Sequence, residues 1–206
     1  MATTRPRERI LDAATRLFAD DGINATSVDR VVAEADVAPM TVYRKFGGKD
    51  GLVAATVERW SVRWLAWLRD ESSLHGEDAG ARRESPPDAE GAAARLEGLW
   101  DALEKWFADE GFRGSYVDNV ATELRAKPGH PAQAAVAAHR AALRELLADI
   151  AATAGAPSPE GAALQLQVLI DGATAVAVLD RQPGAAASAR AMAAAVLSAP
   201  GALAGR

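Results

Sequence analysis

The spacing of apolar residues between positions 26 and 49 constrains the fold of this chain more than any other feature of the sequence. The first half of this stretch has four apolar residues at helical spacing: Val28, Val31, Val32 and Ala35. Recurrence at i, i+3, i+4 and i+7 predicts one buried face of a short helix. Asp36 then interrupts the pattern and Val37 is a single apolar residue after it. The stretch therefore predicts two short helices joined by a tight turn.

Local signals support both helices. Thr26 followed by Asp29 has the spacing of an N-cap and a residue that hydrogen-bonds back to it, as in a capping box. Pro39 suits the first turn of the second helix, where its missing N–H costs nothing. Val42 and Phe46, four residues apart, are predicted to face inward.

The other residues of the second helix are predicted to face outward: Met40, Thr41, Tyr43, Arg44 and Lys45. An α-helix fits the major groove of B-DNA, where its first residues meet base edges. Lys49 begins the next helical stretch, where it can reach a phosphate. Between positions 38 and 49 the charged side chains are all positive. This surface has the chemistry of a DNA-reading helix. A plain helical hairpin with solvated Arg and Lys is the alternative.

The residues from 10 to 52 resemble the helix-turn-helix of the TetR family of transcriptional regulators. The matching positions are Ile10, Ala14, Leu17, Phe18, Gly22, Thr26, Val31, Val32, Ala35, Val37, Thr41, Tyr43, Phe46, Lys49 and Leu52. Two positions depart from the family pattern: Asp36 replaces a turn glycine, although Asp tolerates a left-handed backbone, and Ala38 replaces a capping serine. Neither departure removes a side chain that faces the groove.

The resemblance implies a set of DNA contacts. The candidates are Thr26, Ser27, Pro39, Met40, Thr41, Tyr43, Arg44, Lys45 and Lys49. Ser27, Tyr43, Lys49 and Arg5 are expected at phosphates. Base reading is expected from Met40, Thr41 and Arg44, with Pro39 and Lys45 as further candidates. Residues 1 to 6 are expected to be a disordered arm, either lying on DNA or frayed.

Composition favours a cytoplasmic all-α protein. Alanine is abundant, tyrosine and phenylalanine are few, and cysteine is absent, so disulfides and thiolate metal sites are excluded. The sequence shows no signal peptide and no uncharged apolar stretch long enough to span a membrane. The net charge of −5 is unusual for a DNA-binding protein. Phosphate attraction depends more on which face carries positive charge than on the total.

We expect an N-terminal three-helix head, residues 1–48, and a C-terminal antiparallel helical body, residues 49–206, with about nine helices in all. The helices are expected near residues 7–20, 28–35, 39–46, 49–70, 92–109, 115–127, 131–154, 160–180 and 185–197. Residues 72–90 are polar, rich in Gly, Pro and charge, and lack periodicity, which predicts a mobile loop. Trp60, Trp64 and Trp67 form a stripe on the long fourth helix, as core or as a pocket wall.

The stretch from Glu160 to Asp180 is apolar on almost every side, so a helix there must be covered on most sides. Gly172 and several alanines would let two such helices approach closely. Together with the last helix, this stretch could form a four-helix interface with a second copy, and the family resemblance also implies a homodimer through about residues 160–197. A buried central helix of a monomer is the alternative.

The body offers candidates for an effector pocket: Trp64, Trp100, Phe107, Tyr116, Asn119, Glu123 and His139. Aromatic walls with a few polar groups are typical of ligand sites, although neighbouring helices could equally satisfy these polar groups. We expect no metal, no cofactor and no enzymatic activity, because no His pair, phosphate loop or nucleophile motif is present. The sequence thus predicts a ligand-responsive regulator, most simply a repressor released from a palindromic operator by a small apolar effector. An all-α adaptor without sequence-specific DNA binding is the contrasting class.

Overall fold

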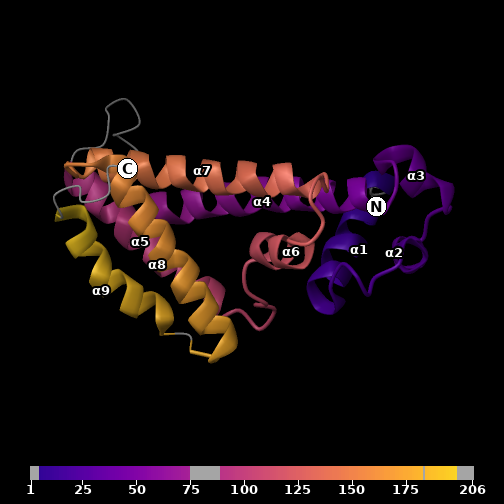
Figure 1. Cartoon of the computed structure of the whole chain (residues 1–206). Helices are drawn as coiled ribbons and strands as arrows, with labels where there is room; N and C mark the ends of the chain where they lie inside the picture. Colours follow the sequence, from indigo (N-terminus) through magenta and orange to yellow (C-terminus); the bar gives the residue numbers. More distant parts are fainter. Residues whose placement is uncertain (1–4, 75–88, 183, 199–206) are drawn as a thin grey trace. The chain divides into compact units, whose positions relative to one another are not determined.

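The computed structural model describes residues 5–74, 89–182 and 184–198, and this part of the chain contains helices and no strand. Figure 1 shows the helices, which are α1 (Pro6–Asp21), α2 (Val28–Ala35), α3 (Met40–Phe46), α4 (Lys49–Leu74), α5 (Ala89–Phe107), α6 (Tyr116–Leu124), α7 (Ala132–Thr153), α8 (Pro159–Leu179) and α9 (Ala185–Ser198). The prediction of an all-α fold with a three-helix N-terminal part is confirmed.

Two helix ends differ from the sequence-based expectation. α4 continues to Leu74 and α5 already begins at Ala89, so the predicted loop over 72–90 was too wide at both ends. The rest of the predicted loop, residues 75–88, lies outside the described residues, as do residues 1–4 of the predicted arm. Pro6 already belongs to α1, with Arg5 at its N-cap.

The chain forms two compact units. Unit 1 comprises Met1–Arg63 and Ser115–His139, and unit 2 comprises Trp64–Gly114 and Arg140–Arg206. Of the three boundaries, one falls within α4, one in the connection before α6 and one within α7. The expected division at residues 48 and 49 remains a prediction, because compactness groups the first part of α4 and all of α6 with the N-terminal helices.

Unit 1 has a continuous apolar core that includes residues far apart in the sequence. Helix α1 contributes Ile10, Leu11, Leu17 and Phe18, and the helix-turn-helix contributes Val31, Val32, Ala35 and Val42. Helix α6 adds Tyr116, Val117, Val120 and Leu124. Each fully buried aliphatic side chain contributes about 1.5–3 kcal/mol to folding. Helix α6 is therefore part of the structural support of α1–α3, which we call the head.

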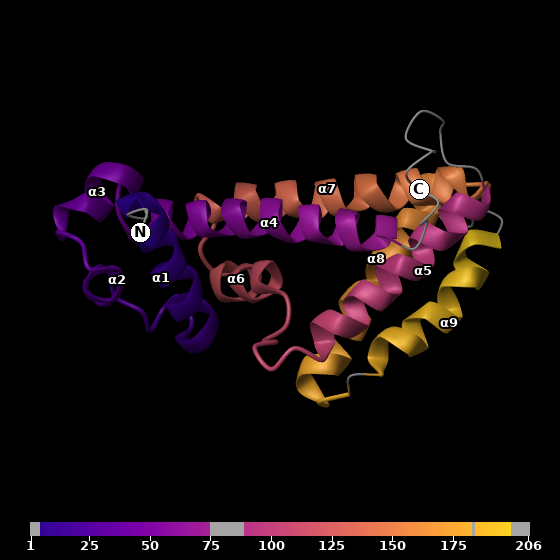
Figure 2. The ribbon, with the colours of Figure 1, turned by 180° about the vertical axis from the view of Figure 1, so that it is seen from behind.

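Unit 2 is built on α8 and α9, which run antiparallel and pack together, with α5 also contacting α9 (Figure 2). Leu99, Trp100 and Leu103 of α5 are fully buried. Arg140 on α7 pairs with Asp171 on α8 at 2.7 Å between Nη2 and Oδ2. These contacts fix α8 from one side and leave its other side free of described contacts along much of its length.

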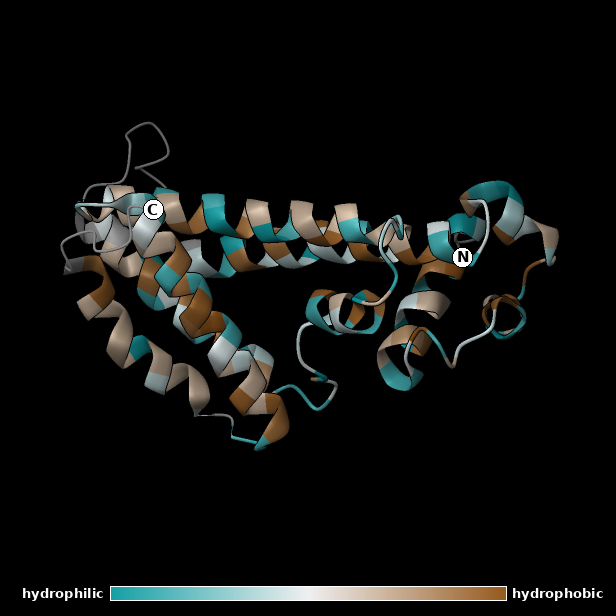
Figure 3. Cartoon of the chain, in the orientation of Figure 1, coloured by the Kyte–Doolittle hydropathy of each residue, from teal (hydrophilic) through white to brown (hydrophobic). Residues whose placement is uncertain are grey.

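Helix α8 is, within the described residues, the one helix long and apolar enough to cross a membrane by length and composition, and 44% of the relevant window is buried within the chain. This is weak evidence for a membrane span, because a core or interface helix passes the same test. Figure 3 shows α9 mostly in the tan and brown shades of apolar residues. These two helices therefore carry an apolar face that the chain itself covers only in part.

Candidate nucleic-acid interface

The turn between α2 and α3 has the geometry of a helix-turn-helix. Asp36 adopts the left-handed conformation at φ 49° and ψ 59°. The backbone N–H groups of Asp36 and Val37 donate to the carbonyls of Ala33 and Val32, both at 3.3 Å, which closes the end of α2. Asp36 thus takes the conformation that the sequence analysis expected it to tolerate.

The N-cap of α2 differs from the prediction. Ser27, not Thr26, caps the helix, and its hydroxyl oxygen accepts the Arg30 N–H at 3.2 Å. The Thr26 side chain is fully buried, and its hydroxyl lies 2.8 Å from the carbonyl oxygen of Gly22 and 3.3 Å from that of Leu17. The prediction of Thr26 as a DNA contact is therefore wrong, because this hydroxyl ties the end of α1 to the start of α2.

Helix α3 presents most of the predicted reading residues to solvent. Met40 is 70% exposed and Tyr43 is 51% exposed. Pro39, Arg44 and Lys45 are exposed as well, and α3 contains no acidic residue. These side chains form what we call the reading face, defined as Pro39, Met40, Tyr43, Arg44 and Lys45.

Thr41 departs from this pattern. It is only 9% exposed and lies beside the fully buried Val42, so the prediction that it faces outward is wrong. Its position at the edge of the core leaves at most its outer surface for contact with a base. Phe46 is half-buried, and the Arg7 guanidinium lies over its ring at 5.7 Å from the centroid.

Gly51 fixes the junction between α3 and α4. A Cβ atom at this position would lie 1.9 Å from the carbonyl oxygen of Phe46, a distance that no side chain can adopt. The C-terminal end of α3 and the first turn of α4 are therefore in direct backbone contact. Helical periodicity does not reveal this role of Gly51, because the role depends on the packing of two separate helices.

Lys49 begins α4 and its side chain is partly buried. Burial lowers the pKa of Lys49, and the charge of Lys127 lowers it further, whereas Asp50 and Glu123 raise it. An ammonium group that is partly desolvated and lies in the field of a second cation gains more than an ordinary surface lysine from a nearby anion. A DNA phosphate would supply that anion. Lys127, from the α6–α7 connection, was missed by the sequence reasoning because it is distant along the chain.

Glu123 on α6 is not available for an effector. Its Oε1 accepts the Ile23 N–H at 3.0 Å, and its Oε2 accepts the backbone N–H and side-chain amide of Asn24, both at 3.1 Å. Lys127 Nζ in turn donates to Asn24 Oδ1 at 2.8 Å. A Cβ at Gly22 would lie 3.0 Å from Glu123 Oε1, and the φ of +85° there also favours glycine. The carboxylate therefore joins α6 to the α1–α2 connection, which corrects its assignment to the pocket.

Tyr116 and His139 also have internal partners within unit 1. The Tyr116 hydroxyl and the Thr56 hydroxyl are 2.8 Å apart, and burial raises the pKa of Tyr116 although this hydrogen bond opposes the shift. His139 Nδ1 lies 2.9 Å from the Ser61 hydroxyl. Both side chains are buried. The Tyr116 hydroxyl and His139 Nδ1 are thus satisfied by side chains of α4, which agrees with the alternative reading of these residues as structural.

The remaining predicted effector residues divide between the units. Asn119 is exposed in unit 1, whereas Trp64, Trp100 and Phe107 are buried in unit 2. Trp100 is fully buried, and within the described chain its indole N–H has no hydrogen-bond partner. Of these residues, Phe107 lines a cavity of about 740 Å³. Among the described residues no group of three or more His, Asp or Glu side chains could hold a metal ion.

Comparison with known proteins supports the interpretation of the head. The family model described as bacterial regulatory proteins, tetR family, matches residues 10–56. A helix-turn-helix transcriptional repressor of Mycobacterium tuberculosis is 40% identical over 63 residues, which cover 31% of this chain and 34% of that protein. An uncharacterised regulator of the same type from Bacillus subtilis is 39% identical over 54 residues, covering 26% and 29%. The matched region thus spans about a third of the curated relatives.

Solved structures extend the similarity to most of the chain. A TetR-family transcriptional regulator from Streptomyces coelicolor superposes with a TM-score of 0.74 at 28% identity, covering 93% of this chain and 94% of that chain. Escherichia coli NemR in its reduced form gives a TM-score of 0.76 at 16% identity, over 93% and 97% of the two chains. The second likeness shows the shared fold alone.

Proposed function

Because the chain belongs to the TetR family of bacterial regulatory proteins, we propose that it is a DNA-binding transcriptional regulator that acts as a homodimer on a palindromic operator. The relatives that match it are transcriptional regulators rather than enzymes. The observation that carries the proposal is the reading face of α3, which is exposed, contains two cations and no carboxylate, and stands on a packed core. An adaptor helix would not need this combination.

The geometry supports a division of labour among the DNA contacts. Ser27, Tyr43, Lys49 and Arg5 bind phosphates, which supplies affinity without sequence information. The Ser27 oxygen accepts the Arg30 N–H, so its O–H remains able to donate to a phosphate. Met40, Arg44, Lys45 and Pro39 meet base edges, where an arginine bidentate to guanine is the commonest specific contact.

The free face of α8 and α9 supports a homodimer. The exposed apolar residues on it are Leu164, Val168, Val176, Leu179 and Met192. The first four occupy one side of α8, and Gly172 between them is exposed, with nothing within 4 Å of the place where a Cβ atom would stand. Such a patch on a soluble protein marks an interaction surface. A two-fold axis through it would present two reading faces, which must lie about 34–36 Å apart to enter successive major grooves.

The regulatory sign and the class of effector form the second part of the proposal. One relative is named as a repressor, and an apolar molecule bound in unit 2 could alter the spacing of the two heads in a dimer. Lowering operator occupancy from 99% to 1% requires a coupling free energy of about 5.5 kcal/mol. The regulator we propose is thus a repressor that a small, largely apolar effector releases from DNA.

Selection of bound sequences from a random duplex pool tests the proposal directly. Wild-type protein should enrich a palindrome whose half-sites are centred about one helical turn apart. The double variant Tyr43→Ala/Arg44→Ala should lose this enrichment, whereas Arg125→Ala, which removes an exposed cation from the end of α6, should retain it. Recovery of no enriched sequence by the wild-type dimer would contradict the proposal and favour an adaptor without DNA specificity.

A further inference from the structure

A cavity of about 740 Å³ lies within unit 2, between the end of α5 with its following connection and the end of α8. Its lining comes from residues 107–110, Phe112 and Arg113 on one side and from Ala177, Val178 and Arg181 on the other. The volume is within the range of small-molecule sites, about 300–1,000 Å³. We call this cavity the α5–α8 slot. It shares only Phe107 with the pocket residues that the sequence suggested.

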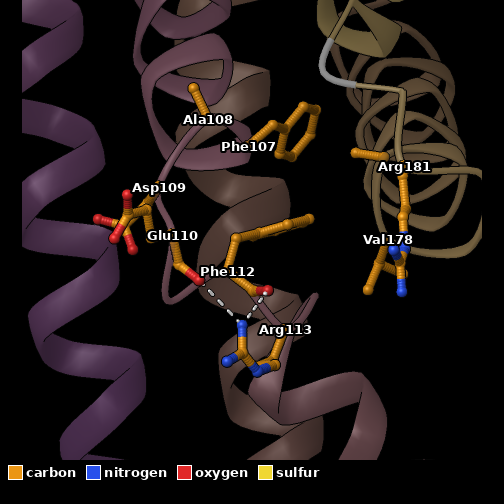
Figure 4. A pocket seen from close by; sticks show the side chains of 9 residues that line it. Phe107, Ala108, Asp109, Glu110, Phe112, Arg113, Val178 and Arg181 are labelled. Carbon is orange, nitrogen blue, oxygen red and sulfur yellow. Dashed lines mark hydrogen bonds between the residues drawn. The ribbon is translucent and has the colours of Figure 1, made fainter.

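One wall of the slot is a packed aromatic cluster. The rings of Phe107 and Phe112 are 5.2 Å apart between centroids, and Trp106 meets Phe112 edge-on at 5.0 Å. Figure 4 shows both phenylalanine side chains pointing from this wall toward Val178 and Arg181. Rings that hold one another in place form a surface that a flat ligand can contact without ordering new side chains.

The charges around the slot are arranged asymmetrically. Arg113 Nη1 donates to the carbonyl oxygens of Glu110 at 3.1 Å and Phe112 at 3.0 Å, which holds its guanidinium beside the aromatic wall. Asp109 Oδ1 accepts the Gly111 N–H at 2.6 Å, so this carboxylate is bound to its own turn. In Figure 4 the Asp109 and Glu110 carboxylates lie on the far side of the wall from Val178 and Arg181. The lining thus carries two carboxylates and one guanidinium on the α5 side, whereas Arg181 supplies the charge on the α8 side.

Arg181 forms the opposite side. It follows the end of α8, is exposed, and has a left-handed backbone at φ 54°. It makes no ion pair or hydrogen bond with another residue that the structure describes. A ligand carboxylate would therefore meet a guanidinium that pairs with no acid in the described part of the chain, opposite two phenylalanine rings.

We propose that the α5–α8 slot binds an aromatic carboxylic acid, whose ring packs on Phe107 and Phe112 and whose carboxylate pairs with Arg181. The proposal rests on the proposed regulatory function in one respect, namely that this ligand is the effector. Binding itself depends only on the slot. The proposal also refines the effector class, from largely apolar to apolar with one negative group.

The probe is 2-naphthoate, compared with 2-naphthalenemethanol, which keeps the ring system and lacks the charge. Isothermal titration with full-length dimer should give a Kd of about 1 mM or tighter for 2-naphthoate, as expected for a ligand of this size. The alcohol should bind at least about tenfold more weakly, since a charge-assisted hydrogen bond is lost. Equal affinity of the two probes, or no binding of 2-naphthoate at about 5 mM, would overturn the proposal.

Two variants locate the binding. Arg181→Gln changes an exposed side chain and should reduce the affinity for 2-naphthoate to that of the alcohol, whereas the matched change Arg125→Gln should leave it unaltered. Val178→Trp places a large ring in the slot and should abolish binding of both probes. If Arg181→Gln bound 2-naphthoate as tightly as the wild type, the assignment of this site would be wrong.

Operator binding measured without any probe separates the two proposals. A protein that binds its operator but not 2-naphthoate would overturn the slot proposal and leave the regulatory function intact. A protein that binds 2-naphthoate but no DNA sequence would do the reverse. Binding of 2-naphthoate that left operator affinity unchanged would overturn the assignment of this ligand class as the effector.

Discussion

Replacing Glu123 with alanine should loosen the α1–α2 connection and thereby weaken DNA binding, although Glu123 is far along the chain from the reading face. The carboxylate accepts three hydrogen bonds from Ile23 and Asn24. Alanine leaves all three donors without this partner. The head would retain its own core but lose the polar link that joins it to α6.

The magnitude follows from the exposure of each donor. The Ile23 N–H is partly buried, and leaving such a group unpaired costs about 1–3 kcal/mol. The two Asn24 donors are exposed, so water can replace the lost acceptor, and each of these hydrogen bonds contributes about 0.5 kcal/mol to the free energy of unfolding. The free energy of unfolding should therefore fall by about 2–4 kcal/mol. Glu123→Gln keeps the shape and one acceptor oxygen, so it should lose about half as much.

Urea unfolding followed by circular dichroism measures the stability, and fluorescence anisotropy with the selected operator measures the DNA affinity. Thr122→Ala, which changes an exposed neighbour on α6, is the control. Both Glu123 variants should bind DNA more weakly in the order of their instability, and Thr122→Ala should match the wild type. If Glu123→Ala unfolded at the wild-type urea concentration, the link between α6 and the head would not support the fold as reasoned.

Four further outcomes are expected. Tyr43→Phe and Lys49→Ala should each weaken binding to all DNA sequences alike, and loss of the Lys49 charge should reduce the salt slope by about one, measured by anisotropy over a salt series. Arg44→Ala should instead relax base preference at one position per half-site, by about 1–3 kcal/mol in a competition assay. Val168→Glu places a charge on the exposed face of α8 and should yield monomers in sedimentation velocity with a loss of operator affinity. Burial raises the pKa of Tyr116 in the folded state. The contribution of Tyr116 to stability is therefore complete below the unfolded-state pKa near 10 and is lost as the pH rises above that value. Tyr116→Phe should remove this part of the alkaline destabilisation, as measured by thermal melts.

Local periodicity predicted the helices of the head well, and it was least accurate at their ends. By residue type, Thr26 and Ser27 both suit an N-cap. The buried Thr26 hydroxyl bonds the Leu17 carbonyl, so the Ser27 hydroxyl caps α2 instead. Thr41 was placed outward because Val42 and Phe46 already account for an inward face. A residue at the edge of that face can be covered by a neighbouring helix, which helical spacing does not reveal.

The candidate effector residues were harder to predict because their partners are distant along the chain. Glu123 contacts residues about 100 positions away, and Tyr116 bonds Thr56 on another helix. A composition of aromatic and polar residues on α6 is equally suitable for a ligand site and for a helix that supports the head. Only the three-dimensional packing of α6 in unit 1 distinguishes these two roles.

Asp36 has a left-handed backbone that glycine would adopt without strain. For aspartate this conformation costs about 1 kcal/mol of stability. Its carboxylate lies 3.6 Å from the Arg9 guanidinium and is almost fully exposed, so it also places a negative charge close to the surface that would face a polyanion. A change of one nucleotide can convert an aspartate codon to a glycine codon. A single nucleotide change would therefore give Asp36→Gly, which has a less strained turn and one negative charge fewer. Natural variation at this position could thus adjust the affinity of the protein for genomic DNA.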